Sequence, residues 1–359
     1  MRRTVQEYQV GTASSSEPRP LLPLTVLPEA LLSSPPMLAS DNELPNVQHP
    51  PNLSPDLAKQ VRRWDFNIHS LPADELPAFC FSVLLSHDEF AQLPLSRTRL
   101  WKYIEAVASK YHSNAFHSFR HAVDVALASS CLVRALQLKK PDLLSPLQVA
   151  AQLIAAVVHD TDHPGVMNGF LVATRHPLAI LYNDRSVLEN HHISTAIALL
   201  SRPEHNFLHN MEKSDQDEFR RLLIDLVLAT DVTTTMPFVK QLEASLEAGE
   251  ELVAARAQQI IIKAADISNP SRSLAIYQKW IDGVMSEFFA QGDAERGLGL
   301  PISMNCDRNT VLTSKCQVGF ITFLVEPVFN CISKCIPEVQ HICMANLHAN
   351  KTHFTNAQE

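Results

Sequence analysis

The chain has 359 residues, of which 46% are hydrophobic and 19% charged, and this composition excludes a wholly disordered protein. The net charge of −8 argues against a nucleic-acid polymer as partner. No uninterrupted apolar run reaches the roughly 18 residues that a membrane span needs, so we expect none. The seven cysteines are odd in number and scattered, which favours free thiols and a cytoplasmic location.

Proline and serine mark the first part of the chain. Residues 1–55 hold ten of the 23 prolines, so we predict a disordered leader or linker there. Glycine is absent between Gly11 and Gly165, which favours helices over a strand-rich fold. We predict one compact all-α domain over residues 56–345 and a flexible tail over residues 346–359.

Helical patterns follow one another through this domain. We expect helices near residues 75–110, 121–137, 146–158, 186–200, 216–231, 236–248, 251–265, 271–290 and 315–336. The segment from Pro146 to Val158 is apolar almost all round, as in a buried helix. It would deliver the residues that follow it into the interior.

Those residues are His159 and Asp160, with His163 four positions after the first histidine. Imidazole and carboxylate together suit divalent metal ions, and a carboxylate beside a histidine can bridge two of them. Three ligand-capable groups in five positions therefore indicate a metal hydrolase. Pro164 and Gly165 then bend or break the helix.

Three further residues could complete a metal site. His117 and His121 are four apart, which would place them on one helix face, although such a pair alone more often packs in a core or on a surface. Asp266 ends an apolar segment, and a buried acid there costs several kcal/mol unless it is paired or metal-bound. The alternative for Asp266 is a helix end that faces solvent.

Eight short motifs carry a resemblance to a known family. The chain is similar to the catalytic domain of class I 3′,5′-cyclic-nucleotide phosphodiesterases, an all-α metal phosphohydrolase of the HD type. In order, the motifs are His-x-x-x-His (117–121), His-Asp-x-x-His-Pro-Gly (159–165), Leu-Glu-Asn-His-His (188–192), Leu-Ala-Thr-Asp (228–231), Ala-Asp-Ile-Ser-Asn-Pro (265–270), Glu-Phe-Phe-x-Gln-Gly-Asp (287–293), Cys-Asp-Arg (306–308) and Gln-Val-Gly-Phe (317–320).

The resemblance implies a role for each site residue. The zinc ligands would be His121, His159, Asp160 and Asp266. A second ion, Mg²⁺ or Mn²⁺, would share Asp160 and otherwise bind water held by His163, Glu189 and Thr230. A hydroxide between the two ions would attack phosphorus, and His117 would protonate the leaving 3′-oxygen. The base would be held by Gln317, Phe320, Val284 and Asn269.

The substrate implied is a 3′,5′-cyclic nucleotide, hydrolysed to the 5′-monophosphate to end a signal. Asn269 favours cAMP, while the Gln317 amide can serve either purine, which leaves cGMP or dual use open. Ser118 stands where the family usually has asparagine. Two alternatives are a cyclic-nucleotide-binding regulator without hydrolytic activity and another HD-type nucleotide phosphohydrolase. The sequence leaves both a monomer and a homodimer open.

Overall fold

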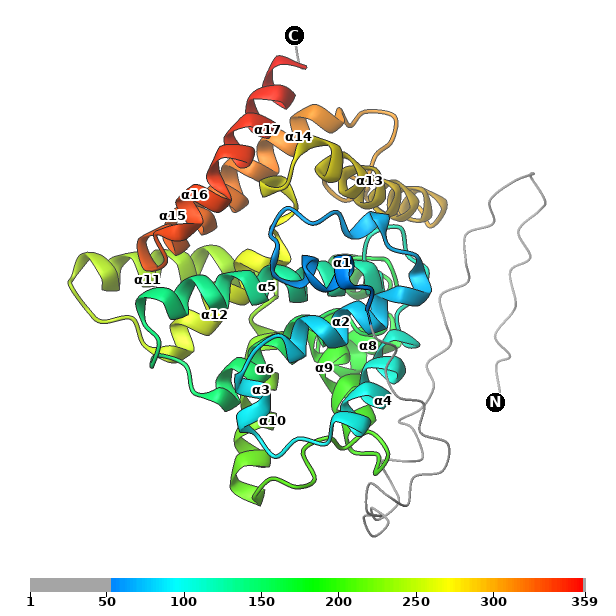
Figure 1. Cartoon of the computed structure of the whole chain (residues 1–359). Helices are drawn as coiled ribbons and strands as arrows, with labels where there is room; N and C mark the ends of the chain where they lie inside the picture. The colour runs from blue at the N-terminus through cyan, green and yellow to red at the C-terminus, as the bar shows by residue number, and fades with distance from the viewer. Residues whose placement is uncertain (1–52, 358–359) are drawn as a thin grey trace, which may run out of the picture.

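The structure is a computed structural model that describes residues 53–357, and no strand occurs among them. Figure 1 shows the helices, which run in the order α1 (Pro55–Ala58), α2 (Leu76–Leu85), α3 (Glu89–Gln92), α4 (Arg97–Ala108), α5 (Phe119–Lys139), α6 (Pro146–Val158), α7 (Asn168–Ala173), α8 (Pro177–Leu181), α9 (Val187–Leu200), α10 (Lys213–Leu228), α11 (Thr235–Glu247), α12 (Ala254–Asp266), α13 (Leu274–Gly297), α14 (Thr313–Phe320), α15 (Glu326–Cys335), α16 (Glu338–Ile342) and α17 (Met344–Asn356). A π-helical turn, Ile321–Val325, joins α14 to α15. The predicted all-α fold is confirmed.

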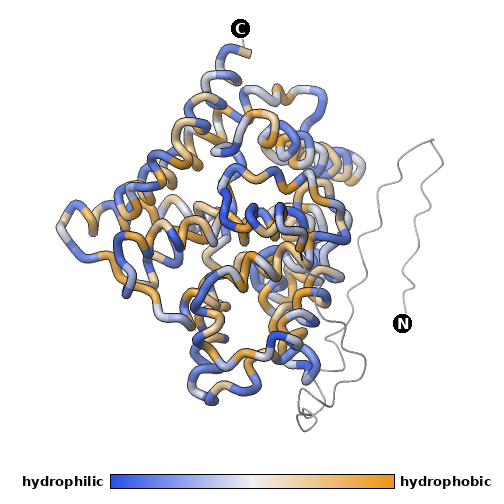
Figure 2. The backbone as a smooth tube through the Cα atoms, in the orientation of Figure 1, coloured by the Kyte–Doolittle hydropathy of each residue, from blue (hydrophilic) through white to orange (hydrophobic). Residues whose placement is uncertain are grey.

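Helix α6 lies at the centre of the fold. Ser145 caps its N-terminus in a capping box with Gln148, and Pro146 occupies the first helical position. Every residue from Val149 to Val158 is buried, and the helix packs against α5, α10 and α12. Figure 2 shows orange and blue alternating along most other helices, which turn one apolar face inward. Each large apolar side chain of α6 contributes about 1.5–3 kcal/mol by burial.

The structure divides or extends several predicted helices. Helix α6 has the predicted bounds, but the stretch 75–110 forms α2, α3 and α4 because short turns interrupt it. The prediction that His117 and His121 share a helix face is wrong. Helix α5 begins at Phe119, and Ser118 before it is extended, with a ψ of 168°. Helices α7 and α8 were not predicted, because each is only about a turn and a half long.

The predicted flexible tail is also wrong for residues 346–357. These residues belong to α17, in which Leu347 and Phe354 are buried. The amide of Asn350 donates to the carbonyl oxygens of Pro270 and Arg272, each at 2.8 Å. The polar composition of the segment hid these contacts. The predicted leader, apart from residues 53–55, lies outside the described residues.

One continuous helical stretch, Thr313–Cys335, is long and apolar enough by composition to cross a membrane, and 39% of its apolar window is buried in the fold. The bent pair Lys213–Leu228 and Val232–Glu247 passes the same test when taken together. Within the described chain α14 packs against α17, and α15 packs against α11 and α12. Core helices of globular folds also meet this criterion, so the absence of a membrane span stays a prediction.

A buried ion pair fastens α5 to the segment that follows α12. Arg272 Nη2 lies 3.1 Å from Asp124 Oδ1, and the two side chains are 0% and 1% exposed. The Arg272 guanidinium also lies over the Trp64 ring, 4.5 Å from its centroid. Asp124 is one turn after His121 on α5, and Arg272 follows Asp266 by six residues. The pair therefore fixes the relative position of two predicted metal ligands.

We expect Arg272→Met to destabilise the fold by about 3–5 kcal/mol, because it leaves the Asp124 carboxylate buried without its partner. Urea unfolding measures this loss. Arg63→Met is the matched control, since the Arg63–Asp65 pair is 55% and 62% exposed and such pairs contribute little. Equal unfolding free energies for the two variants would contradict the role of the buried pair.

Candidate active site

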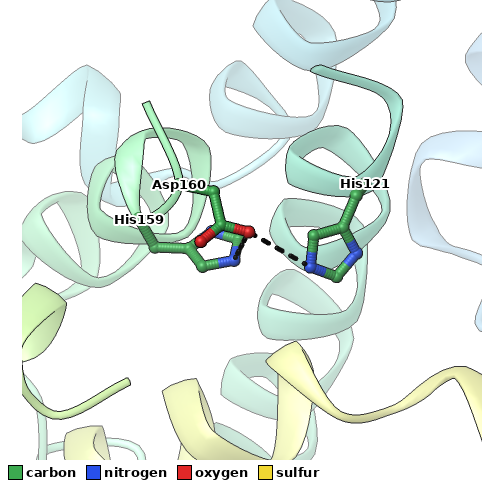
Figure 3. A group of neighbouring side chains, drawn as sticks. All are labelled: His121, His159 and Asp160. Carbon is green, nitrogen blue, oxygen red and sulfur yellow. Dashed lines mark ion pairs between the residues drawn. The ribbon is translucent and has the colours of Figure 1, made fainter. Parts of the chain in front are cut away.

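Four side chains from three helix ends converge on one point. His121 lies in the first turn of α5, His159 and Asp160 follow α6, and Asp266 is the last residue of α12. Asp266 Oδ1 lies 3.2 Å from the Nε2 atom of each histidine. Asp160 Oδ2 lies 3.1 Å from His159 Nε2 and 3.7 Å from His121 Nε2, as Figure 3 shows. The structure thus brings together the four predicted zinc ligands.

The chemistry of this cluster fits a bound cation. His159 Nδ1 donates to the carbonyl oxygen of Ala156 at 2.9 Å, which leaves Nε2 free to act as a ligand. That Nε2 atom is buried without a hydrogen-bond partner, although two carboxylates lie near it. Burial opposes ionisation of Asp160, but His159 offsets this and holds the pKa of Asp160 well below its ordinary value. Carboxylates beside imidazole Nε2 atoms, one of which has no hydrogen-bond partner, form a suitable set of ligands for Zn²⁺.

Asp160 also belongs to a second group of possible ligands, with His163 and His192. Its Oδ1 atom lies 3.7 Å from His192 Nε2, whereas Oδ2 faces His121 and His159. The two carboxylate oxygens therefore face two different clusters, which is the arrangement that a bridging carboxylate requires. His192 was missed as a site residue, and its place in Leu-Glu-Asn-His-His was the signal.

Of the three predicted water-holding residues, His163 belongs to this second group, and Glu189 and Thr230 make other contacts. His163 Nδ1 accepts from the Gly165 amide at 3.0 Å, so the proton is on Nε2. Burial and the nearby His117 lower the pKa of His163 well below its ordinary value. Burial raises the pKa of Glu189 to about 7, and Asn168 donates to this carboxylate at 3.0 Å. Thr230 donates its hydroxyl to the carbonyl oxygen of Val227. Their role with water stays a prediction.

His117 stands beside these clusters, and Glu287 from α13 holds it. The Glu287 carboxylate accepts from His117 Nδ1 at 2.6 Å, and from the backbone amides of Phe116 and His117 at 2.6 and 2.9 Å. Burial lowers the pKa of His117, but the charge and hydrogen bond of Glu287, with smaller effects from Asp160 and Asp266, raise it to about 9. Glu287 thus occupies Nδ1 of His117 and favours the protonated form of the ring. Glu287 begins the motif Glu-Phe-Phe-x-Gln-Gly-Asp, but no role was predicted for it from the sequence.

A close approach of two backbones makes this pairing possible. A Cβ on Gly283 of α13 would lie 2.5 Å from the carbonyl oxygen of Ala115. Only glycine lets the helix lie so near the segment that ends in His117. Ser118, the departure from the family pattern, donates to the carbonyl oxygen of Phe116 at 3.3 Å and does not cap α5.

Three of the four predicted base-binding residues lie on α13 and α14. Gln317 is 3% exposed, and its Oε1 accepts from the Tyr277 hydroxyl at 2.6 Å. Val284 and Phe320 are half-buried at the edge of the apolar core. Val284 precedes Glu287 by three residues, or about one helical turn on α13. One helix therefore carries both the partner of His117 and one of the predicted base-binding residues.

Comparisons with known proteins agree with this geometry. Residues 116–347 match the 3′,5′-cyclic nucleotide phosphodiesterase family. The chain belongs to this family. It is 37% identical to a dual specificity calcium/calmodulin-dependent 3′,5′-cyclic nucleotide phosphodiesterase 1B of Bos taurus over 281 residues, which are 77% of this chain and 52% of the relative. It is 36% identical to the 1C protein of Homo sapiens over 304 residues, covering 83% and 42% of the two chains.

A solved structure shares the fold. The phosphodiesterase domain of the rhodopsin phosphodiesterase of Salpingoeca rosetta superposes with a TM-score of 0.77 and 26% identity, covering 84% of this chain and 94% of that chain. The chain spans about half the length of the curated relatives it matches, 52% in the case of the Bos taurus protein.

Asn269, the fourth predicted base-binding residue, is buried and takes part in an internal contact. It is 5% exposed, and its Nδ2 donates to Asp124 Oδ2 at 3.4 Å. Its amide is thus engaged by the buried ion pair of Asp124 and Arg272. The structure places Asn269 in an internal network, and its contact with adenine stays a prediction.

We expect Glu287→Gln to move the alkaline limb of the pH profile of kcat to lower pH. His117 must be protonated to donate, so turnover falls as pH rises through its pKa, and loss of the Glu287 charge lowers that pKa. Glu295→Gln on the same helix is the control, because Glu295 bonds to Gln291 and Ser303 instead. Superimposable profiles for wild type and Glu287→Gln would exclude this role.

We expect Gly283→Ala to lower kcat roughly tenfold or more, because α13 must move away from Ala115 and loosen the Glu287 contact with His117. Gly297→Ala, on the same helix, has nothing within 4 Å of the added methyl group and should leave kcat unchanged. Steady-state kinetics of both variants test the close approach. Wild-type kcat in Gly283→Ala would show that it does not position His117.

Proposed function

We propose that the chain hydrolyses the 3′ phosphoester bond of a 3′,5′-cyclic nucleotide and releases the 5′-monophosphate. The observation that carries this proposal is the Asp160 carboxylate shared by two ligand clusters, with the protonated His117 beside them. Membership of the phosphodiesterase family and the names of the relatives support the same reaction. Hydrolysis would end a cyclic-nucleotide signal.

Two divalent ions are part of the proposal. Two imidazoles and two carboxylates suit Zn²⁺ at the site of His121, His159, Asp160 and Asp266. Mg²⁺ or Mn²⁺ suits the second site, where Asp160 would supply oxygen and water the rest. When bound, two such ions lower the pKa of a water molecule and neutralise phosphate oxygens.

The chain's own residues perform the remaining steps. The new bond forms between the water oxygen and phosphorus, and the bond from phosphorus to the 3′-oxygen breaks. The water loses one proton to solvent, and His117 regains a proton from solvent after the reaction. His117 gives its Nε2 proton to the leaving 3′-oxygen, because Glu287 occupies Nδ1 and keeps the ring charged. Glu189 and the neutral His163 and His192 would orient water at the second site. Gln317 would hold the purine edge while Phe320 and Val284 enclose the ring.

Nucleotide preference depends on the Gln317 amide. A hydroxyl both donates and accepts, so Tyr277 can hold this amide in either orientation, and each orientation suits a different purine. This supports use of both cAMP and cGMP, and the two relatives described above are named as dual-specificity enzymes. The predicted preference for cAMP depended on a contact between Asn269 and adenine. In the structure the Asn269 amide contacts Asp124 instead, which gives this preference no support.

A cytoplasmic location and the partner predictions also belong to the proposal. All seven cysteines are free, which suits a reducing compartment. The acidic net charge of −8 supports a small nucleotide and not a nucleic-acid polymer as partner. A membrane-partition assay tests the predicted absence of a membrane span. A mass measurement in solution decides between a monomer and a homodimer.

The direct test supplies cAMP and cGMP separately with Mg²⁺ and measures release of the 5′-nucleotide. Release from either substrate supports the proposal. Binding without release would instead identify a cyclic-nucleotide-binding regulator. Hydrolysis of linear nucleoside phosphates alone would identify another HD-type phosphohydrolase.

Two variants separate the roles of acid and ligand. We expect His117→Ala to lose roughly 100- to 10,000-fold in kcat while it keeps its metal content, because only the proton donor is removed. We expect Asp160→Ala to lose both metal and turnover. His348→Ala is the control, because His348 is exposed on α17. Full activity in the first variant, or normal metal content in the second, would refute the assigned role.

A further inference from the structure

A carboxylate held by two imidazoles lies next to the metal-binding turn. Asp162 Oδ1 lies 2.7 Å from His112 Nε2, and Asp162 Oδ2 lies 2.8 Å from His191 Nε2. The three side chains are between 17% and 30% exposed, so all are partly shielded from water. We call this trio the Asp162 clamp. None of its members has a role in the proposed reaction.

The clamp joins three of the segments that build the active site. His112 begins the segment that leads to the proton donor His117. Asp162 lies in the turn between Asp160 and His163. His191 is on α9, next to His192. Each segment thus supplies one member of the clamp and at least one residue of the reaction centre.

The backbone of the turn shows why a side chain is needed there. His163 N donates to Asp160 O at 3.1 Å, and Asp162 between them has a φ of +66°. This left-handed conformation favours glycine at the third position of a turn. An aspartate at such a position accepts backbone strain, and here its carboxylate makes two hydrogen bonds that glycine could not make.

The clamp reinforces other contacts that hold the turn from both sides. On one side, Asn114 Nδ2 donates to the carbonyl oxygens of His117 and His163 at 3.0 and 2.7 Å. On the other, His192 Nδ1 donates to Thr161 O at 2.8 Å. The result is a stacked pair of rings, His163 on His117, with centroids 3.9 Å apart.

We propose that the Asp162 clamp positions the Asp160–His163 turn against His117 and so sets the distance between the proton donor and the metal-binding carboxylate. This inference rests on the proposed phosphodiesterase reaction. The clamp itself is not a third metal site. Its imidazoles donate to different carboxylate oxygens, and the trio is not among the ligand groups that converge within the described chain.

Substitutions at Asp162 distinguish the contribution of its carboxylate from that of its left-handed backbone. Asp162→Gly fits the φ of +66° but removes both acceptors. Asp162→Asn tolerates the same conformation and keeps one acceptor oxygen. We expect Asp162→Gly to lower kcat roughly ten- to a hundredfold, with KM within about twofold of wild type and metal content unchanged. Asp162→Asn should recover much of this loss.

A kcat of Asp162→Gly that equals or exceeds that of Asp162→Asn would overturn the proposal. If Asp162 serves only the backbone turn, Asp162→Gly will be at least as active as wild type and Asp162→Asn will show no advantage. Asn305→Gly is the matched control, because Asn305 also has a φ of +66° but lies in the loop between α13 and α14. It should keep wild-type kcat.

Amide hydrogen exchange supplies a readout that does not depend on activity. His112→Phe and His191→Phe keep a ring at each position but remove the donor, and neither alters the backbone of the turn. We expect faster exchange at the His163 amide in both. An unchanged exchange rate at the His163 amide in both variants would overturn the proposed role of the clamp. If the wild-type chain hydrolyses neither cyclic nucleotide, the proposed function fails. The exchange experiment still shows whether the clamp holds the Asp160–His163 turn.

Discussion

Two imidazoles and two carboxylates packed into the interior form the constraint around which the other helices are arranged. His121 and His159 are each 1% exposed, and Asp160 and Asp266 reach them from the ends of two apolar helices. Ionised groups in such surroundings are unfavourable unless a counter-charge accompanies them. The packing of α5 against α6 and α12, together with the Asp124–Arg272 pair, keeps these groups within ligand distance of one another. A bound cation would turn this electrostatic cost into binding energy.

Helix α13 is the second organising element, because it contacts both His117 and Gln317. Glu287 faces His117, while Tyr277 and Met285 contact Gln317. The rigidity of one helix therefore fixes the distance between His117, the proposed proton donor, and Gln317, which would hold the purine. Gly283 permits this arrangement by letting α13 lie against Ala115.

The sequence predicted those parts of the site that local pattern determines. The apolar segment from Pro146 to Val158 identified α6, and the residues after it were correctly expected in the interior. Longer-range contacts were not visible. Glu287 reaches His117 from far along the chain, and Asn350 secures α17 through backbone carbonyls near Arg272. No periodicity reports such pairings, which is why the role of Glu287 and the helical C-terminus were missed.

The central claim is that His121, His159, Asp160 and Asp266 hold one metal ion and that Asp160 is shared with a second. Anomalous X-ray diffraction at the zinc edge, from crystals of the zinc-replete protein with Mn²⁺ added, tests this claim most directly. We predict a zinc peak within bonding distance of all four side chains and a separate manganese peak beside the other oxygen of Asp160. A zinc peak elsewhere, or no second ion at Asp160, would contradict it.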